Sequence, residues 1–165
     1  MGRLTAVREP VRVIYTCYGG THSSPVAAAI HLGQLPRDRV PSADQLLRVP
    51  RFDRVDGASR GRLTLVGIDG RGNPVYVVGR GNTALAALRN TIETTLRLAG
   101  RADLPLLLVD TLGCVNGLMR IGGYLSRALG LVPIGRPLVV LGTQLTYPRL
   151  VRLVEQAEAA LSDFS

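Results

Sequence analysis

Residues 11–33 read VRVIYTCYGGTHSSPVAAAIHLG, and this stretch predicts a strand, a loop and a helix in succession. The run 11–16 is apolar and rich in β-branched residues, which is typical of a buried strand, and it ends at Cys17. Two consecutive glycines then favour a loop. The small residues that follow predict a helix with Pro25 in its first position and Gly33 at its end.

This order brings the loop to the positive end of a helix dipole. Ser23 or Ser24 is expected to cap the helix, and the free backbone N–H groups of the loop can bind an anion. A sulfur beside such groups is stabilised as a thiolate, so we expect Cys17 to be partly ionised near neutral pH. The predicted anion-binding residues are Tyr18, Gly19, Gly20, Thr21, Ser23 and Ser24.

The composition predicts one folded domain. The chain has 165 residues, of which 46% are hydrophobic, and this is enough to bury a sizeable core. We expect a single α/β domain over residues 1–165, with residues 1–10 as a loose tail. The chain has no apolar run of about 18 residues and opens without the apolar segment of a signal peptide. We therefore expect a cytoplasmic protein that does not bind membranes.

All 20 basic residues are Arg, and the formal net charge is +8. The lack of Lys excludes a P-loop lysine and a Schiff-base lysine within this chain. The Arg residues are spread along the chain and only 4% of the residues are aromatic, a pattern that does not favour nucleic acid as a partner. The positive field would still attract a small phosphorylated or anionic ligand. Two Cys and two His form no familiar zinc spacing, so no metal site is expected.

The remaining chain alternates further strands and helices. A capping box at Ser42 predicts a short helix to Arg48, and two strand-like runs around a Gly/Asn turn predict a β-hairpin. The expected elements are hairpin strands at 62–69 and 74–80, a helix at 84–100 capped by Asn82 or Thr83, a strand at 104–109, a helix at 118–129, a strand at 137–141 and a helix at 147–161. This alternation predicts an α/β fold with three Rossmann-like layers and a mainly parallel sheet with a β-hairpin insertion.

Ligands bind beyond the carboxyl ends of the strands in such sheets, so three loops are expected to meet there. These loops are residues 17–24, 110–116 and 142–144. Cys17 is the predicted nucleophile and His22 the predicted proton donor, and Asp110 is expected to orient His22 or to hold magnesium. The predicted supporting residues are Arg80, Asn82, Cys114, Asn116, Arg120, Thr143 and Gln144.

The first loop, CYGGTHSSP, resembles those of two families of cysteine phosphoenzymes. The low-molecular-weight protein tyrosine phosphatases match at Cys17, Gly19, Ser24 and Pro25. Ser23 stands where that family has a phosphate-binding Arg, a group that Arg80 or Arg120 could supply. The IIB phosphocarrier domains of sugar phosphotransferase systems match at Cys17, Gly20, Ser23 and Ser24. Over its whole length the chain is similar to a bacterial family of unknown function, most clearly in the segments CYGGTHSS and YVxGRxN.

These observations lead to three hypotheses. The leading one is a phosphate- or anion-binding protein with thiol-based phosphoryl transfer through Cys17, in the manner of a phosphatase or a phosphotransfer enzyme. The first alternative is a Rossmann-like or degenerate P-loop nucleotide-binding protein, the one case in which magnesium is expected as a cofactor. The second alternative is a non-catalytic regulatory or assembly module. A homo-oligomer is compatible with each of them.

Overall fold

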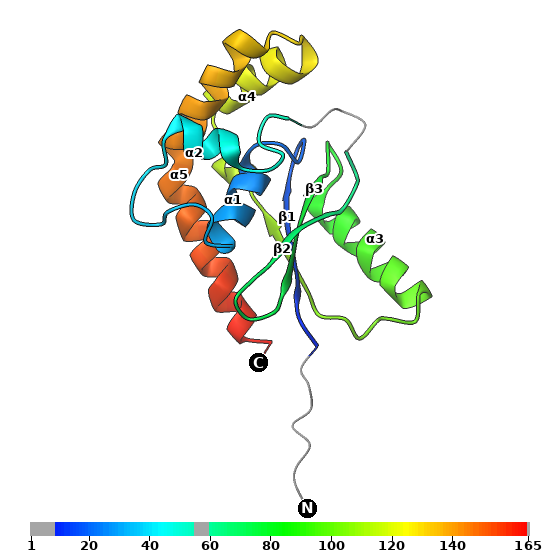
Figure 1. Cartoon of the computed structure of the whole chain (residues 1–165). Coiled ribbons are helices and arrows are strands. Elements are labelled where there is room, and N and C mark those ends of the chain that lie inside the picture. Colours follow the sequence, from blue (N-terminus) through cyan, green and yellow to red (C-terminus); the bar gives the residue numbers. More distant parts are fainter. Residues whose placement is uncertain (1–8, 55–59, 165) are drawn as a thin grey trace, which may run out of the picture.

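The computed structural model describes residues 9–54 and 60–164, and it contains one four-stranded sheet (Figure 1). The strands lie in the order β2(Thr64–Ile68), β3(Pro74–Gly79), β1(Arg12–Cys17) and β4(Leu106–Asp110). β1 pairs in parallel with β3 and β4, whereas β2 pairs antiparallel with β3. The predicted α/β fold and mainly parallel sheet are confirmed. The predicted β-hairpin consists of β2 and β3, and it is part of the sheet itself, because β3 is the neighbour of β1. Most of the predicted tail, 1–10, lies outside the described residues.

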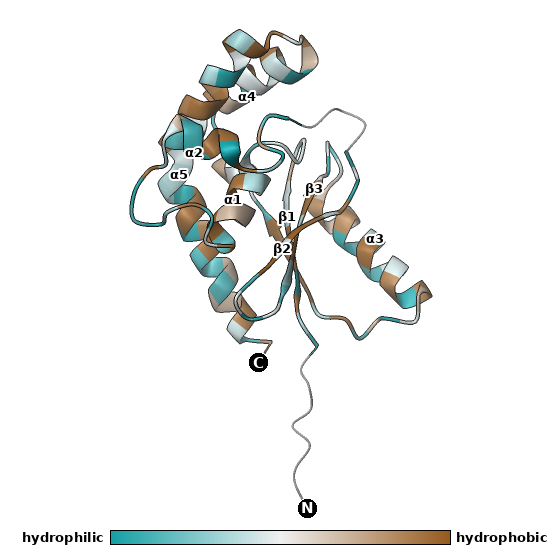
Figure 2. Cartoon of the chain, viewed as in Figure 1, coloured by the Kyte–Doolittle hydropathy of each residue, from teal (hydrophilic) through white to brown (hydrophobic). Residues whose placement is uncertain are grey.

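Helices cover both faces of this sheet (Figure 1). α1(Ser23–His31) and α5(Val132–Ser162) pack on one face, where Val13 and Tyr15 of β1 belong to the main core. α3(Leu85–Leu98) covers the other face through a smaller cluster around Ile14. Successive residues of β1 therefore face opposite clusters, as the pleat of a strand requires. In Figure 2, α3 carries hydrophobic and hydrophilic residues along its whole length, as expected for a helix with one side on a sheet.

A helical hairpin lies beyond the carboxyl ends of the strands (Figure 1). We use this name for α4(Gly117–Gly123), the π-helix η3(Tyr124–Ala128) and the first half of α5. Glycine lets its helices approach closely, since a Cβ on Gly122 would lie 2.7 Å from the backbone oxygen of Gly135. Two short helices complete the structure: α2(Ala43–Arg48), which contacts α5, and the 3₁₀-helix η2(Leu112–Cys114). The helical hairpin forms a wall above the edge of the sheet at which the parallel strands end.

The strand predicted at 137–141 and the loop predicted at 142–144 are wrong, because α5 runs through both as one helix of 31 residues. A short apolar run has the same appearance in a buried strand and in a buried helix. The helical signal lies in the spacing of the buried residues Val139, Val140, Thr143, Tyr147, Leu150 and Val151. Among the described residues, none of the helices combines the length and the apolar character needed to cross a membrane.

The capping predictions hold at one helix and fail at another. Ser42 forms the predicted capping box with Gln45, accepting from its backbone N–H while the Gln45 side chain accepts from that of Ser42. For α3, the N-cap is Ala84 instead of Asn82 or Thr83, and it makes no side-chain cap hydrogen bond. The backbone N–H of Thr83 donates instead to the carbonyl of Arg80, the residue after β3, which extends the turn before the helix begins.

Candidate functional site

The carboxyl ends of β1, β3 and β4 meet at one edge of the sheet. The backbone N–H of Arg80, just after β3, donates to the carbonyl oxygen of Cys17 at 2.9 Å. On the other side of β1, Asp110 is the Cα partner of Thr16. The structure thus brings together the strand ends that carry Cys17, Arg80 and Asp110, which is the edge where parallel sheets bind ligands.

The sulfur of Cys17 has two polar neighbours from its own loop. The backbone N–H of Gly20 donates to Sγ at 3.1 Å, and the hydroxyl oxygen of Ser24 lies 3.0 Å from Sγ. Cys17 is only 4% exposed, yet it lines a pocket. Both neighbours can stabilise a thiolate in this position, because each can direct a hydrogen at the sulfur.

The loop crosses the end of β3 backbone to backbone. Gly20 has a φ of 69°, and a Cβ on it would lie 2.8 Å from the backbone nitrogen of Gly79. A Cβ on Gly79 would in turn lie 2.5 Å from the carbonyl carbon of Gly19. The backbone N–H of Gly81 donates to the Tyr18 carbonyl at 2.8 Å and closes the same crossing. Two glycines are therefore needed to hold the loop against the sheet edge.

The start of α1 differs from the prediction. Its N-cap is His22, which makes no side-chain cap hydrogen bond, so the assignment of Ser23 or Ser24 as the cap is wrong. The serine hydroxyls have other partners: Ser24 contacts Sγ, and Ser23 lies 2.8 Å from the hydroxyl of Thr111. The first backbone N–H groups of α1 have no intrahelical acceptors, as at every helix start. The residues around this helix start, Thr21, His22 and Ser23, line the pocket described below.

Asp110 and Arg80 form an ion pair at the same edge. Arg80 Nη2 lies 2.9 Å from Asp110 Oδ2, and Arg80 Nη1 donates to the Thr83 carbonyl at 2.6 Å. The other carboxylate oxygen of Asp110 accepts from the backbone N–H of Leu112. Arg80 Nε is buried and has no hydrogen-bond partner within residues 9–54 and 60–164. Asp110 therefore orients Arg80 and not His22.

The carboxylate that contacts His22 is Asp53, a residue that the sequence did not single out. Asp53 is fully buried, and its side chain accepts from the Ser126 hydroxyl at 2.8 Å and from Arg136 Nε at 2.9 Å. His22 Nε2 lies 3.3 Å from Asp53 Oδ1. The backbone N–H of Asp53 donates to the Thr21 carbonyl at 2.9 Å. Asp53 thus joins the cysteine loop to the helical hairpin.

The hydrogen bonds to Asp53 change its acidity. Burial alone would raise the pKa of this carboxyl, but hydrogen bonds from His22, Arg136 and Ser126 outweigh that effect and lower the pKa to about 2. The residue also has a φ of 50°, a left-handed conformation in which Asp is enriched. The only sequence signal for Asp53 is its residue type at such a turn, since its partners lie far along the chain.

We predict that acid destabilises the protein through Asp53. Its pKa in the folded state is below the ordinary value of 3.8, so its stabilisation is complete above that value and is lost as the pH falls through about 2. The loss should be on the order of 2 kcal/mol, because one pKa unit corresponds to about 1.4 kcal/mol. Urea unfolding at a series of pH values checks this. Asp53→Asn should flatten the profile in this window, and an unchanged profile would contradict the assignment.

Arg51 is a second residue that the sequence analysis missed. It has a φ of 72°, and its Nη1 donates to the Thr64 hydroxyl at 3.2 Å. Its Nε and Nη2 atoms are buried and lack a hydrogen-bond partner in the described part of the chain. Burial and the charge of Arg62 lower the pKa of Arg51, whereas interaction with Cys17 acts in the opposite direction. Its guanidinium therefore lies within electrostatic reach of the sulfur.

A pocket of about 800 Å³ opens between the sheet edge and the helical hairpin. Its sheet side includes Cys17, Tyr18, His22, Arg80 and Asn82, and its hairpin side includes Met119, Arg120, Gly123, Tyr124 and Arg127. Four arginines line it, and three of them, Arg60, Arg120 and Arg127, form no ion pair with a carboxylate of the described residues. The Arg60 guanidinium lies 5.8 Å from the ring centroid of Tyr18. As far as the described part of the chain shows, the positive charge of these three arginines is not balanced by ion pairs.

Several predicted supporting residues have structural contacts instead. Asn116 caps α4 and donates from its amide to the Gly142 carbonyl at 2.7 Å. Thr143 is buried inside α5 and donates to the Val139 carbonyl. Cys114 is a free, buried thiol whose pKa is raised by burial. These residues are absent from the lining of the 800 Å³ pocket, whereas Asn82 and Arg120 belong to it.

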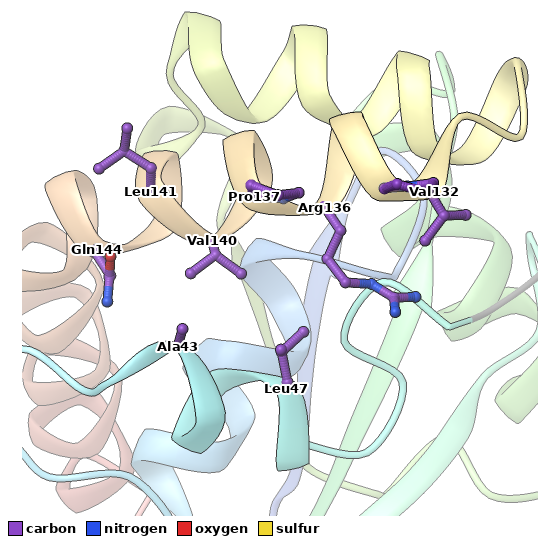
Figure 3. Close-up of a pocket in the computed structure, with 9 residues that line it drawn as sticks. Ala43, Leu47, Val132, Arg136, Pro137, Val140, Leu141 and Gln144 are labelled. Atoms are coloured by element: carbon purple, nitrogen blue, oxygen red, sulfur yellow. The ribbon is translucent and has the colours of Figure 1, made fainter.

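Gln144 lines a different depression. Figure 3 shows it on α5, where Val140 faces Ala43 and Leu47 of α2, and Pro137 and Leu141 of α5 also belong to the lining. This pocket has a volume of about 510 Å³ and is mainly apolar. The Gln144 amide donates to the Pro41 carbonyl at 3.0 Å. Gln144 therefore holds the segment before α2 and lies apart from the pocket of Cys17.

The fold and this edge define an α/β protein with a cysteine-containing strand–loop–helix at the centre of a mainly parallel sheet. A family model described as "Protein of unknown function (DUF3189)" matches residues 12–159, and the chain belongs to this family. Neither the curated proteins nor the solved structures include a match to the chain. Within the described residues, no group of three or more His, Cys, Asp or Glu side chains is placed to hold a metal ion.

Proposed function

We propose that the protein binds a phosphorylated small molecule in the pocket and that Cys17 accepts its phosphoryl group. The observation that carries this proposal is the position of the Cys17 sulfur, which accepts a hydrogen bond from Gly20 N–H in a pocket lined by Arg60, Arg120 and Arg127. None of these three arginines forms an ion pair with a carboxylate of residues 9–54 and 60–164. A Rossmann-like arrangement of the layers would place the ligand at this edge of the sheet. We also propose, as the sequence predicts, that the protein acts in the cytoplasm.

The proposed reaction has two steps, and the groups around the Cys17 sulfur take part in both. The Cys17 thiolate attacks the phosphorus of a phosphate monoester, so that a P–S bond forms while the P–O bond to the leaving group breaks. The leaving oxygen takes a proton from His22. A water molecule or an acceptor hydroxyl then gives its proton back to His22 and attacks phosphorus, so that a new P–O bond forms while the P–S bond breaks and the thiolate leaves. The N–H groups at the start of α1 and Arg80, held by Asp110, stabilise the charge on the phosphoryl oxygens.

His22 has the surroundings that a proton donor needs. Asp53 fixes its Nε2, which leaves Nδ1 for the leaving group. The other edge of the ring faces Gly123 of α4, where a Cβ would lie 2.8 Å from Cε1 and 3.3 Å from Nδ1. A side chain at position 123 would therefore block this nitrogen.

Mass spectrometry of the intact chain tests this function. After incubation with an aryl phosphate, we expect one acid-labile phosphoryl adduct, located on Cys17 by peptide analysis. Cys17→Ser should abolish the adduct, whereas Cys114→Ser is the matched control and should keep it. If no adduct forms and iodoacetamide modifies Cys17 at the rate of free cysteine, phosphoryl transfer through Cys17 is excluded.

The two alternatives predict different results for the same pocket. A nucleotide-binding protein would keep its affinity for nucleotides after Cys17→Ala, with magnesium as a cofactor. A regulatory or assembly module would show no thermal shift with phosphate, nucleotides or sugar phosphates. Thermal shifts with these three kinds of ligand separate the cases. A ligand that binds only the folded state, present at a concentration of a hundred times its Kd, adds about 2.7 kcal/mol to the free energy of unfolding.

A further inference from the structure

The pocket is larger than a phosphate group requires. Its volume of about 800 Å³ lies within the roughly 300–1,000 Å³ that is common for sites of drug-sized ligands. Away from Cys17 and the arginines, much of its lining is apolar or aromatic. These residues are Tyr18, Leu112, Val115, Met119, Tyr124 and Ala128. The pocket therefore has room for a second, less polar part of a ligand beside this wall.

Two tyrosines are placed to contact that part. The chain has five Tyr, of which Tyr15 and Tyr147 are buried in the main core and Tyr76 packs on the side of α3. Tyr18 and Tyr124 are 47% and 61% exposed, and both line the pocket. Their rings are therefore available to a ligand.

The two rings come from opposite sides of the pocket. Tyr18 follows Cys17 directly in the loop, and its ring is already next to the Arg60 guanidinium. Tyr124 is the first residue of the π-helix η3 in the helical hairpin. Short π-helical segments are frequent at functional sites, because the extra residue in the turn changes the direction of side chains. A flat group between these walls would therefore have one tyrosine on the sheet side and one on the side of the helical hairpin.

We infer that the ligand carries a planar ring joined to its phosphate, as in an aryl phosphate or a nucleoside phosphate. This inference rests on the proposed function, since it names the class of molecule that the same pocket binds. The ring contacts Tyr18 and Tyr124, while the phosphate lies at the sulfur and the arginines. Tyrosine rings favour flat partners because stacked aromatic groups gain more than their buried area alone provides. An alkyl phosphate of the same charge lacks this stacking contribution.

Calorimetric titration of the full chain tests the inference, with Cys17→Ser used to prevent turnover. Two matched pairs of ligands are compared: phenyl phosphate with ethyl phosphate, and adenosine monophosphate with ribose 5-phosphate. We expect the ring-bearing member of at least one pair to bind about tenfold more tightly, in line with the stacking of one ring. The pair that shows the preference identifies the source of the ring.

Variants locate the ring contact. Tyr18→Ala and Tyr124→Ala should each reduce at least threefold the ratio of the affinities for the ring-bearing and the ring-free member of that pair. Ile121→Ala is the control, because Ile121 is 56% exposed and does not line the pocket. Equal affinities within both pairs, or an equal effect of Ile121→Ala, would overturn the ring contact while the phosphate site stands. Absence of binding by all four ligands would overturn the phosphate site and, with it, the ring contact.

Discussion

Replacement of Asp53 by Ala is expected to lower the free energy of unfolding by about 3 kcal/mol at neutral pH. The reason is that removal of one partner from a buried charged network leaves the others without compensation. Asp53 is fully buried and accepts hydrogen bonds from the Ser126 hydroxyl and from Arg136. After the substitution, the buried Ser126 hydroxyl loses its acceptor, and Arg136 loses its only ion-pair partner among the described residues.

Urea unfolding of Asp53→Ala measures the effect, and an exposed aspartate supplies the control. Asp103 has a long contact of 3.6 Å with Arg101, and both side chains are largely exposed. Asp103→Ala should therefore change the stability by about 0.5 kcal/mol or less. A loss below about 1 kcal/mol for Asp53→Ala would show that the buried network contributes little. Because Asp53 also contacts His22, the variant should bind phosphorylated ligands more weakly.

Gly79→Ala is expected to destabilise the protein by about 2 kcal/mol and to open the cysteine loop. The new Cβ would lie 2.5 Å from the Gly19 carbonyl carbon and 2.8 Å from the Gly20 nitrogen. These are backbone atoms, so no side-chain rotation can relieve the overlap, and forced overpacking typically costs about 1–3 kcal/mol. The loop must move away from β3, which weakens the hydrogen bond from Gly20 to Sγ.

The matched control for this variant is Gly113→Ala. Gly113 is exposed in η2, and a Cβ there would meet no atom within 4 Å. Thermal unfolding and the rate of iodoacetamide modification at Cys17 are measured for both variants. Only Gly79→Ala should lower the melting temperature and change the rate at Cys17. A Gly79→Ala protein as stable as the wild type would mean that the backbone crossing is looser than the structure indicates.

The strand, loop and helix at 11–33 could be predicted because their signals are local. β-branched residues favour the strand, consecutive glycines favour the loop, and Gly33 ends α1 with a φ of 69°. The meeting of Cys17, Arg80 and Asp110 also follows from a general rule, since parallel strands place their carboxyl ends at one edge. Here a pattern within a few residues was sufficient to fix the local structure.

The contacts that could not be predicted are those between distant segments. Asp53 accepts from Ser126 and Arg136, which are 73 and 83 residues away along the chain. Nothing near Asp53 in the sequence indicates that it is buried, because the prolines around it are typical of a surface segment. The run 137–141 fails for a related reason. Its apolar character indicates burial, but only the longer spacing of buried residues reveals that it lies in a helix.

The main-chain hydrogen bonds between the cysteine loop and the end of β3 have a consequence for how this protein can diverge. Arg80 N–H bonds to the Cys17 carbonyl and Gly81 N–H to that of Tyr18, so the separation of positions 17 and 80 is set without either side chain. Substitutions at these two positions can therefore exchange the reactive group or its counter-charge while the scaffold stays constant. A relative with a different residue at position 17 would present that residue at the same point in space, and its chemistry could differ without any change of fold.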